Sequence, residues 1–163
     1  MHTLKVIAGI AISGLVLAGC ESNSDDDDTT AKASLRVLHA SENAPAVNVY
    51  LNNAMTPAVD TLDYGSASAW AEVDAGTYAT EVYGILPGGA DTNDAVIDAD
   101  LTLEADVTYT VVAVNPLTSI DAKVFSDDGS DQDSSKVRVQ VAHLAPDAPA
   151  VDVHVTAPGT ALS

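Results

Sequence analysis

The chain has 163 residues and a formal net charge of −18, from 24 acidic and 6 basic side chains. This length predicts one domain, or one domain with part of another, and the acidic charge excludes nucleic acid as an expected partner. The single cysteine excludes a disulfide framework and a cysteine-based zinc site.

The N-terminus is typical of an export signal. Lys5 opens a short basic region, and residues 6–17 form an apolar stretch that is too short to span a bilayer. The stretch ends in Leu17-Ala18-Gly19-Cys20, which resembles the lipobox of bacterial lipoproteins. The resemblance implies that residues 1–19 are a signal peptide and that Cys20 carries acyl chains, including palmitate, that anchor the protein to a membrane.

The segment 20–33 is expected to be a disordered, acidic tether. It is rich in Ser, Asp, Asn and Thr, includes the run Asp25–Asp28, and shows no apolar periodicity. Fully extended, the tether reaches at most about 45 Å. Glu21 follows the cysteine, where an Asp would resemble an inner-membrane retention signal, so we expect the outer membrane if the cell is Gram-negative.

The segment 34–126 is predicted to fold as one all-β module. Aliphatic and β-branched residues are abundant, apolar and polar residues alternate with period two, and Asn, Gly and Pro separate the alternating runs. We expect an antiparallel, immunoglobulin-like β-sandwich. The expected strands are 35–40, 47–51, 58–62, 67–73, 77–84, 97–103, 107–114 and 120–125.

Two aromatic residues have specific expected roles in this sandwich. Tyr109 follows a Leu-Glu-Ala-Asp-Val-Thr run that resembles the corner before a late immunoglobulin strand, where a tyrosine hydroxyl bonds to the backbone. Trp70 is expected to pack against aliphatic side chains, because no cysteine pair is present.

A strand–turn–strand unit occurs twice in the chain. The sequence of residues 35–51 returns at residues 139–155 with a constant offset, which aligns the two histidines, Pro45 with Pro149, and the valines that follow these prolines. The aligned motif residues are His39, Pro45, His143 and Pro149.

The repeated unit resembles a bacterial family called domain of unknown function 4397 (DUF4397). Its copies open with a His-Ala-Ser-Pro-Asp-Ala-Pro-Ala-Val-Asp-Val-Tyr type of run, which residues 143–154 follow closely and residues 39–50 follow with Glu42, Asn43 and Asn48 as departures. The resemblance implies an extracytoplasmic β-sandwich without an established activity.

The duplication also suggests domain boundaries. We expect 127–136 to be an acidic linker and 137–163 to hold the first strands of a second, incomplete module. Two alternatives remain open: these strands complete the first sandwich, or they exchange between chains.

The histidines of the repeated unit and the acidic residues between its two copies have structural explanations as well as functional ones. His39 and His143 share strand parity with valines, so each is expected to point into the core and hold the turn that follows. Asp127, Asp131 and Asp133 are weak calcium candidates because they surround Gly129, but a linker explains them better.

The sequence contains no phosphate-binding glycine loop, no nucleophile elbow and no His-Glu-x-x-His motif. We therefore expect a non-enzymatic, cofactor-free, lipid-anchored envelope module for binding, adhesion or spacing, with an envelope protein or glycan as the expected partner. The first alternative is a small-ligand or calcium-dependent carbohydrate-binding lipoprotein. The second is an envelope hydrolase in which His39 or His143 meets a Ser and a carboxylate.

Overall fold

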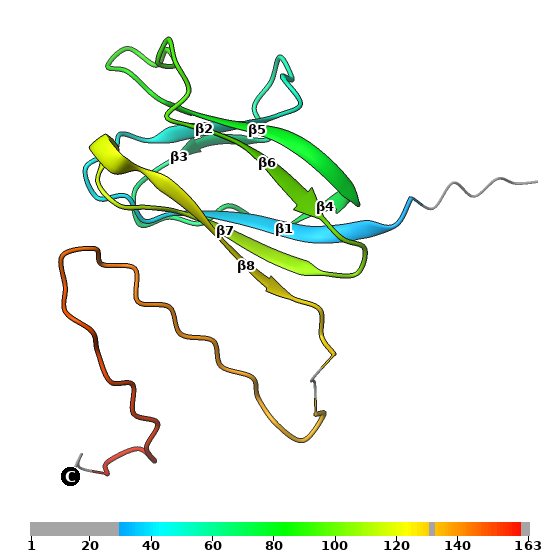
Figure 1. Cartoon of the computed structure of the whole chain (residues 1–163), viewed down its shortest axis with the longest axis vertical. Coiled ribbons are helices and arrows are strands. Elements are labelled where there is room, and N and C mark those ends of the chain that lie inside the picture. Colours follow the sequence, from blue (N-terminus) through cyan, green and yellow to red (C-terminus); the bar gives the residue numbers. More distant parts are fainter. Residues whose placement is uncertain (1–29, 131–132, 161–163) are drawn as a thin grey trace, which may run out of the picture.

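A computed structural model describes residues 30–130 and 133–160, and residues 30–127 form a β-sandwich of two four-stranded sheets (Figure 1). Sheet A has the order β4 (Ala71–Asp74), β1 (Lys32–His39), β7 (Thr108–Val114) and β8 (Asp121–Asp127). Sheet B has the order β3 (Val59–Leu62), β2 (Val47–Leu51), β5 (Gly76–Gly84) and β6 (Ile97–Leu103). The short 3₁₀ helix η1 (Leu117–Ser119) precedes β8. The sandwich class predicted from the alternation is confirmed.

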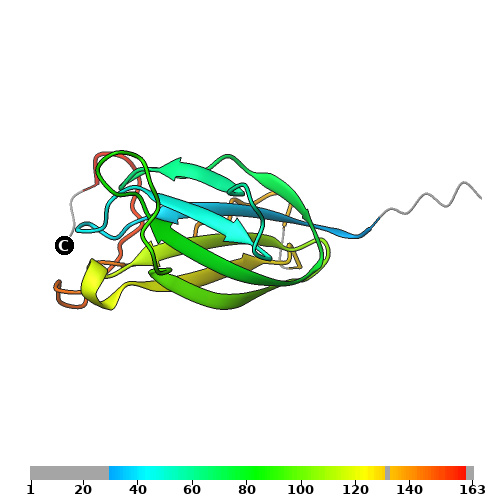
Figure 2. The ribbon, with the colours of Figure 1, turned by 90° about the horizontal axis from the view of Figure 1, so that it is seen from above.

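The strands of the two sheets run in roughly the same direction, as the view from above shows (Figure 2). This alignment gives the sandwich two ends. At the entry end the chain comes into β1 and leaves β8. At the distal end lie the turns 40–46, 85–96 and 115–120, because β1, β5 and β7 finish there.

One pair of strands departs from the antiparallel expectation. Every pair in the two sheets is antiparallel except β1 with β7, which is parallel, with Leu35 opposite Tyr109 and His39 opposite Ala113. The physical reason is the position of β1 between β4 and β7. These two neighbours run in opposite directions, so β1 can be antiparallel to only one of them.

The predicted strand 67–73 is shorter than expected. Only Ala67 forms an isolated bridge, to Leu38, and the regular ladder of β4 begins at Ala71. Between them the Ser68 hydroxyl, rather than a backbone carbonyl, accepts the Val37 N–H at 2.9 Å. A side chain thus replaces one ladder bond and interrupts the strand.

Trp70, predicted to pack against aliphatic side chains, borders a surface hollow with Val37, Val59 and Leu62 but is not buried. Trp70 lies just before β4 and is 50% exposed. The Arg36 guanidinium sits 4.5 Å from the centre of its ring. The ring is at the edge of the sandwich, where it gains a cation–π contact and keeps one side in water.

The sandwich core is divided into two apolar clusters. The cluster at the entry end contains Ala33, Leu35, Leu101, Leu103, Val107 and Tyr109. The cluster toward the distal end contains Val37, Val47, Val49, Leu62 and Val82. Their inward positions follow the period-two alternation of each strand. Small and β-branched side chains fill this core, and it holds one aromatic residue within the two clusters, Tyr109.

Tyr109 closes the turn between β6 and β7. Its ring is buried, and its hydroxyl oxygen accepts the Glu104 N–H at 3.0 Å. Asp106 takes a positive φ of 61° in the same turn, a conformation that Asp tolerates better than most residues. The contact is the backbone hydrogen bond that a tyrosine corner requires.

The second copy of the repeated unit has no strand partner in the structure. Residues 137–155 are extended but form no ladder among the described residues, and their valines are exposed. The physical reason is that an extended segment becomes a strand only when the N–H and C=O groups of a neighbouring segment form hydrogen bonds with its own.

The described part of the chain contains no helix with the length and hydropathy that a membrane span requires.

Candidate functional site

His39 is a structural centre at the distal end of the sandwich. It ends β1 and is fully buried, at 0% exposed. Its Nε2 lies 2.9 Å from the Pro45 carbonyl oxygen, and the Ser41 N–H donates to Nδ1 at 3.3 Å. These partners assign the proton to Nε2. Because backbone groups engage both ring nitrogens, His39 holds the turn into β2 and does not reach the surface.

The surrounding turns reinforce this arrangement. The Ser41 hydroxyl donates to the Asn115 carbonyl at 2.5 Å, which joins the β1–β2 turn to the β7–β8 turn. Pro45 packs on Gly84, where an added Cβ would lie 3.0 Å from the proline Cγ. The close approach explains why β5 ends in glycine at this position.

His143 repeats the contact of His39 in a different environment. Its Nε2 lies 3.2 Å from the Pro149 carbonyl oxygen, so the turn geometry is encoded in the repeated unit itself. The side chain is nevertheless exposed, and the expectation that it points into a core is wrong for this structure. The reason is that no strand among the described residues pairs with this segment or covers it.

The acidic residues after β8 are engaged in local turns. Asp127 accepts the Gly129 N–H at 2.9 Å and pairs with Arg138. Asp133 accepts the Ser135 hydroxyl at 2.6 Å, a contact that, as the largest cause, lowers the pKa of its carboxyl below the ordinary value. Asp131 lies outside the described residues, as does Cys20. Within residues 30–130 and 133–160, no three His, Cys, Asp or Glu side chains are grouped to hold a metal ion.

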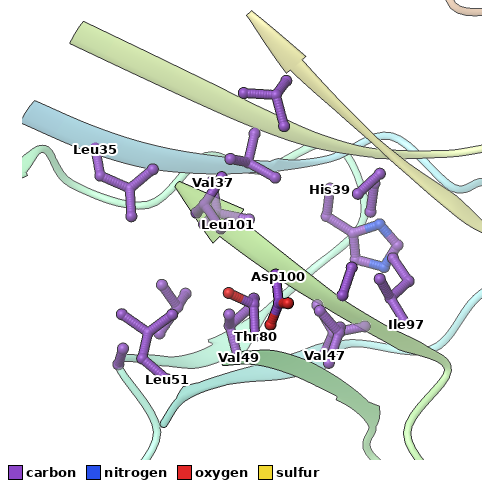
Figure 3. Close-up of a pocket in the computed structure, with 18 residues that line it drawn as sticks. Leu35, Val37, His39, Val47, Val49, Leu51, Thr80, Ile97, Asp100 and Leu101 are labelled. Carbon is purple, nitrogen blue, oxygen red and sulfur yellow. The ribbon is translucent and has the colours of Figure 1, made fainter. Parts of the chain in front are cut away.

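An apolar hollow of about 90 Å³ lies between the two sheets (Figure 3). Its walls come from both core clusters, including Leu35, Val37, Val49 and Leu101, and His39 borders it. The hollow extends toward the edge formed by β6 and β8, where the inward-facing Ala99 and Val124 are exposed. The sandwich is therefore incompletely filled along this edge.

The described surface also carries a shallow depression on the outer face of sheet B, which we call the tyrosine hollow. It is lined by Tyr50, Asn53, Ala54, Glu81, Tyr83 and Asp91 and encloses about 250 Å³. In Figure 1 two loops rise from sheet B on either side of this face, the 52–58 loop and the 85–96 loop.

Period-two alternation places the side chains of the tyrosine hollow. Tyr50 on β2 and Tyr83 on β5 both point outward and meet edge to face, with ring centres 5.6 Å apart. Asp91 reaches back from the 85–96 loop and accepts the Tyr50 hydroxyl at 2.6 Å and the Asn48 amide at 2.7 Å. The result is a fixed aromatic pair beside carboxylates, which can stack on and hydrogen-bond to a polar ligand.

The carboxylates perturb both tyrosines. The hydrogen bond to Asp91, followed by burial, raises the pKa of Tyr50 above its ordinary value of about 10. Burial, followed by the charge of Glu81, raises the pKa of Tyr83 in the same direction. The outer face also lacks compensating cations, because every described Lys and Arg lies on sheet A or in residues 133–160.

Replacing Asp91 with alanine is expected to lower the pKa of Tyr50 toward its ordinary value. The reason is that the variant loses the main acceptor that holds the phenol proton. An alkaline titration followed by tyrosinate absorbance measures this shift. The unchanged protein retains the stability of the Tyr50–Asp91 contact below pH 10 and loses it as the pH rises through the raised pKa.

Asp94→Ala is the matched control for this titration, because Asp94 lies in the same loop and its carboxylate does not contribute to the shift of either tyrosine. Its titration curve should overlay that of the unchanged protein. Identical curves for Asp91→Ala and Asp94→Ala would contradict the arrangement of the tyrosine hollow.

Sequence reasoning did not find this hollow. Alternation alone indicates that Tyr50 and Asn48 face outward, so part of the signal was present on β2. Asp91 lies in a loop without periodicity, and only the closed hairpin around the Ile85–Asp91 bridge brings it to β2.

Comparison with known proteins places the chain in a family. A search of curated proteins finds no match. A family model described as "Domain of unknown function (DUF4397)" matches residues 33–154, which run from the second residue of β1 through β8 and include all but the last residue of the second copy of the repeated unit. Because this match covers more than half of the chain, the chain belongs to the DUF4397 family.

Proposed function

We propose that this protein is a non-enzymatic, lipid-anchored module of the cell envelope that presents a β-sandwich for binding, adhesion or spacing. The observation that carries the proposal is the position of the chain entry. β1 begins at Lys32, so the sandwich takes in the last two residues of the predicted tether 20–33 and starts shortly after the lipobox-like Leu17–Cys20. An anchor on Cys20 therefore joins the sandwich at its entry end, and the distal turns face away from the membrane.

The outer membrane is the proposed location if the cell is Gram-negative, because Glu21 rather than Asp follows Cys20. The charge distribution is compatible with exposure at an envelope surface. Sheet B carries acidic side chains and none of the described Lys or Arg residues. The resulting negative charge keeps the protein soluble and disfavours non-specific contact with anionic lipid headgroups.

Replacing Cys20 with alanine is expected to release the protein from membranes. Each buried CH₂ contributes about 0.8 kcal/mol, so removing the acyl chains abolishes anchoring. In detergent phase separation of cells that express each form, the unchanged protein should enter the detergent phase and Cys20→Ala the aqueous phase. Ser22→Ala, two residues away, should behave like the unchanged protein, and equal partitioning of all three forms would refute the anchor.

The tyrosine hollow favours a second function, recognition of a small ligand such as an envelope oligosaccharide. Aromatic faces stack on sugar rings, and Glu81, Asp91 and Asn53 supply hydrogen-bonding groups around them. This function is the small-ligand form of a carbohydrate-binding lipoprotein and is compatible with the anchor.

Calorimetric titration with N-acetylglucosamine oligomers tests the second function. Tyr83→Ala should weaken binding of the oligomer by about tenfold or more, because the variant loses one of the two aromatic rings on which a sugar can stack. Trp70→Ala, at an exposed aromatic residue just before β4 of sheet A, should leave binding unchanged. Titration with and without calcium separates a direct small-ligand site from a calcium-dependent one, and absence of binding in both conditions argues against recognition of this sugar.

A further inference from the structure

The edge formed by β6 and β8 is open in two respects. Each is the last strand of its sheet, so its outer row of N–H and C=O groups has no strand neighbour among the described residues. The hollow between the sheets extends to this edge, and Val124 on β8 is 51% exposed although it faces inward. An open edge with an apolar interior is a surface that favours strand addition.

The segment that follows β8 carries the complementary pattern. Its valines recur with period two on either side of the His143–Pro149 turn and are exposed: Val139, Val141, Val151 and Val153. In the first copy the aligned residues line the core. We propose that residues 137–155 close the β6–β8 edge of their own sandwich, with 137–143 pairing to β8 as a fifth strand of sheet A.

The direction of the chain fits this closure. β8 runs from the distal end to the entry end, since Asp127 is opposite Thr108 at the start of β7. The chain then turns back, and Figure 1 shows residues 137–143 returning toward the distal end, opposite in direction to β8. The turn 144–148 already borders a hollow shared with the distal residues Ala40, Tyr64 and Asn115.

An ion pair sets the register. Arg138 pairs with Asp127, the last residue of β8. If these two are cross-strand neighbours of an antiparallel pair, Val139 lies opposite Ser126 and Val141 lies opposite Val124. Ser126 and Val124 face inward because they pair with Tyr109 and Val111. The register therefore directs Val139 and Val141 over the open hollow, and a slip by one residue would direct them to solvent.

The second arm of the unit fits the other sheet. In the first copy, the His39–Pro45 turn carries the chain from sheet A into sheet B. The same turn at His143–Pro149 would carry residues 151–155 from the edge of β8 to the edge of β6, where they run parallel to β6. The family match supports one structural unit, because it continues past β8 and ends at residue 154, inside this second arm.

A pair of introduced cysteines tests the register in the full chain. Cys20 is replaced by alanine in every form, so that the introduced thiols are the only ones. Ser126→Cys with Val139→Cys is the matched pair, and Ser126→Cys with Gln140→Cys is the pair displaced by one residue. Both tail positions and Ser126 are exposed, so the sandwich folds in each form.

Under mild oxidation the matched pair should form an intramolecular disulfide at least about tenfold faster than the displaced pair, because only neighbours on one face meet the Cβ distance that a disulfide needs. Amides of residues 137–143 in the cysteine-free protein should exchange at least about tenfold more slowly than those of residues 156–160. Equal cross-linking rates, disulfides formed only between molecules, or unprotected amides would each overturn the closure.

Discussion

His39→Ala is expected to lower the free energy of unfolding by about 3–5 kcal/mol. The change leaves the Pro45 carbonyl and the Ser41 N–H without their shared partner, and each buried unsatisfied group costs about 1–3 kcal/mol. The vacated imidazole volume adds a cavity in a site that is 0% exposed. Urea denaturation followed by circular dichroism measures the loss.

His154→Ala is the matched control, because it removes the same side chain from an exposed position on the second copy. Its effect should stay within about 0.5 kcal/mol. A loss below about 1 kcal/mol for His39→Ala would show that the buried imidazole does not hold the β1–β2 turn. Since a single domain has about 5–15 kcal/mol of stability in total, the expected loss should also reduce the amount of folded protein in cells.

Leu103→Ala is expected to cost about 2–5 kcal/mol. Leu103 ends β6 and is among the largest fully buried side chains of the described residues. It packs in the entry-end cluster with Leu101, Val107 and Tyr109. Because the core is divided and already borders an apolar hollow, few neighbouring side chains can move in to fill the space, and the cost should lie in the upper half of this range.

Urea denaturation measures this loss as a lower midpoint concentration. The slope of the unfolding free energy against urea concentration should stay the same in the variant and the unchanged protein. Leu117→Ala on η1, where the leucine is exposed, is the control and should change stability by less than about 1 kcal/mol. A comparable loss for both leucines would contradict the placement of the core at the entry end. An unchanged Leu103→Ala midpoint would show that the entry-end cluster does not pack as described.

The sequence predicted much of the fold because strand alternation is a local property. Val47, Val49 and Leu51 face inward by period two alone, and all eight strands were found in this way. The largest error in a strand boundary, at 67–73, arises because Ser68 bonds to β1 through its side chain. Composition and alternation do not show whether the backbone or the side chain of a residue forms the hydrogen bond to the neighbouring strand.

The tyrosine hollow was only partly accessible from sequence. The outward direction of Tyr50 follows from its strand, but its contact with Tyr83 depends on the antiparallel register of β2 and β5. Asp91 enters the hollow from a loop, whose path no period describes. The pKa shift of Tyr50 therefore follows from an arrangement that exists only after the sheet has formed.

By itself the sequence determined most of the strands, their inward faces and the repeated His–Pro turn. The turn forms in both copies, at His39 and at His143, because its hydrogen bond joins residues only six positions apart. Strand parity predicted the inward direction of His39, but the tertiary structure alone decided that β1 lies between β4 and β7 and that His143 is exposed. These outcomes depend on which distant strands supply backbone partners and apolar cover, and that choice belongs to the whole sheet rather than to any one segment.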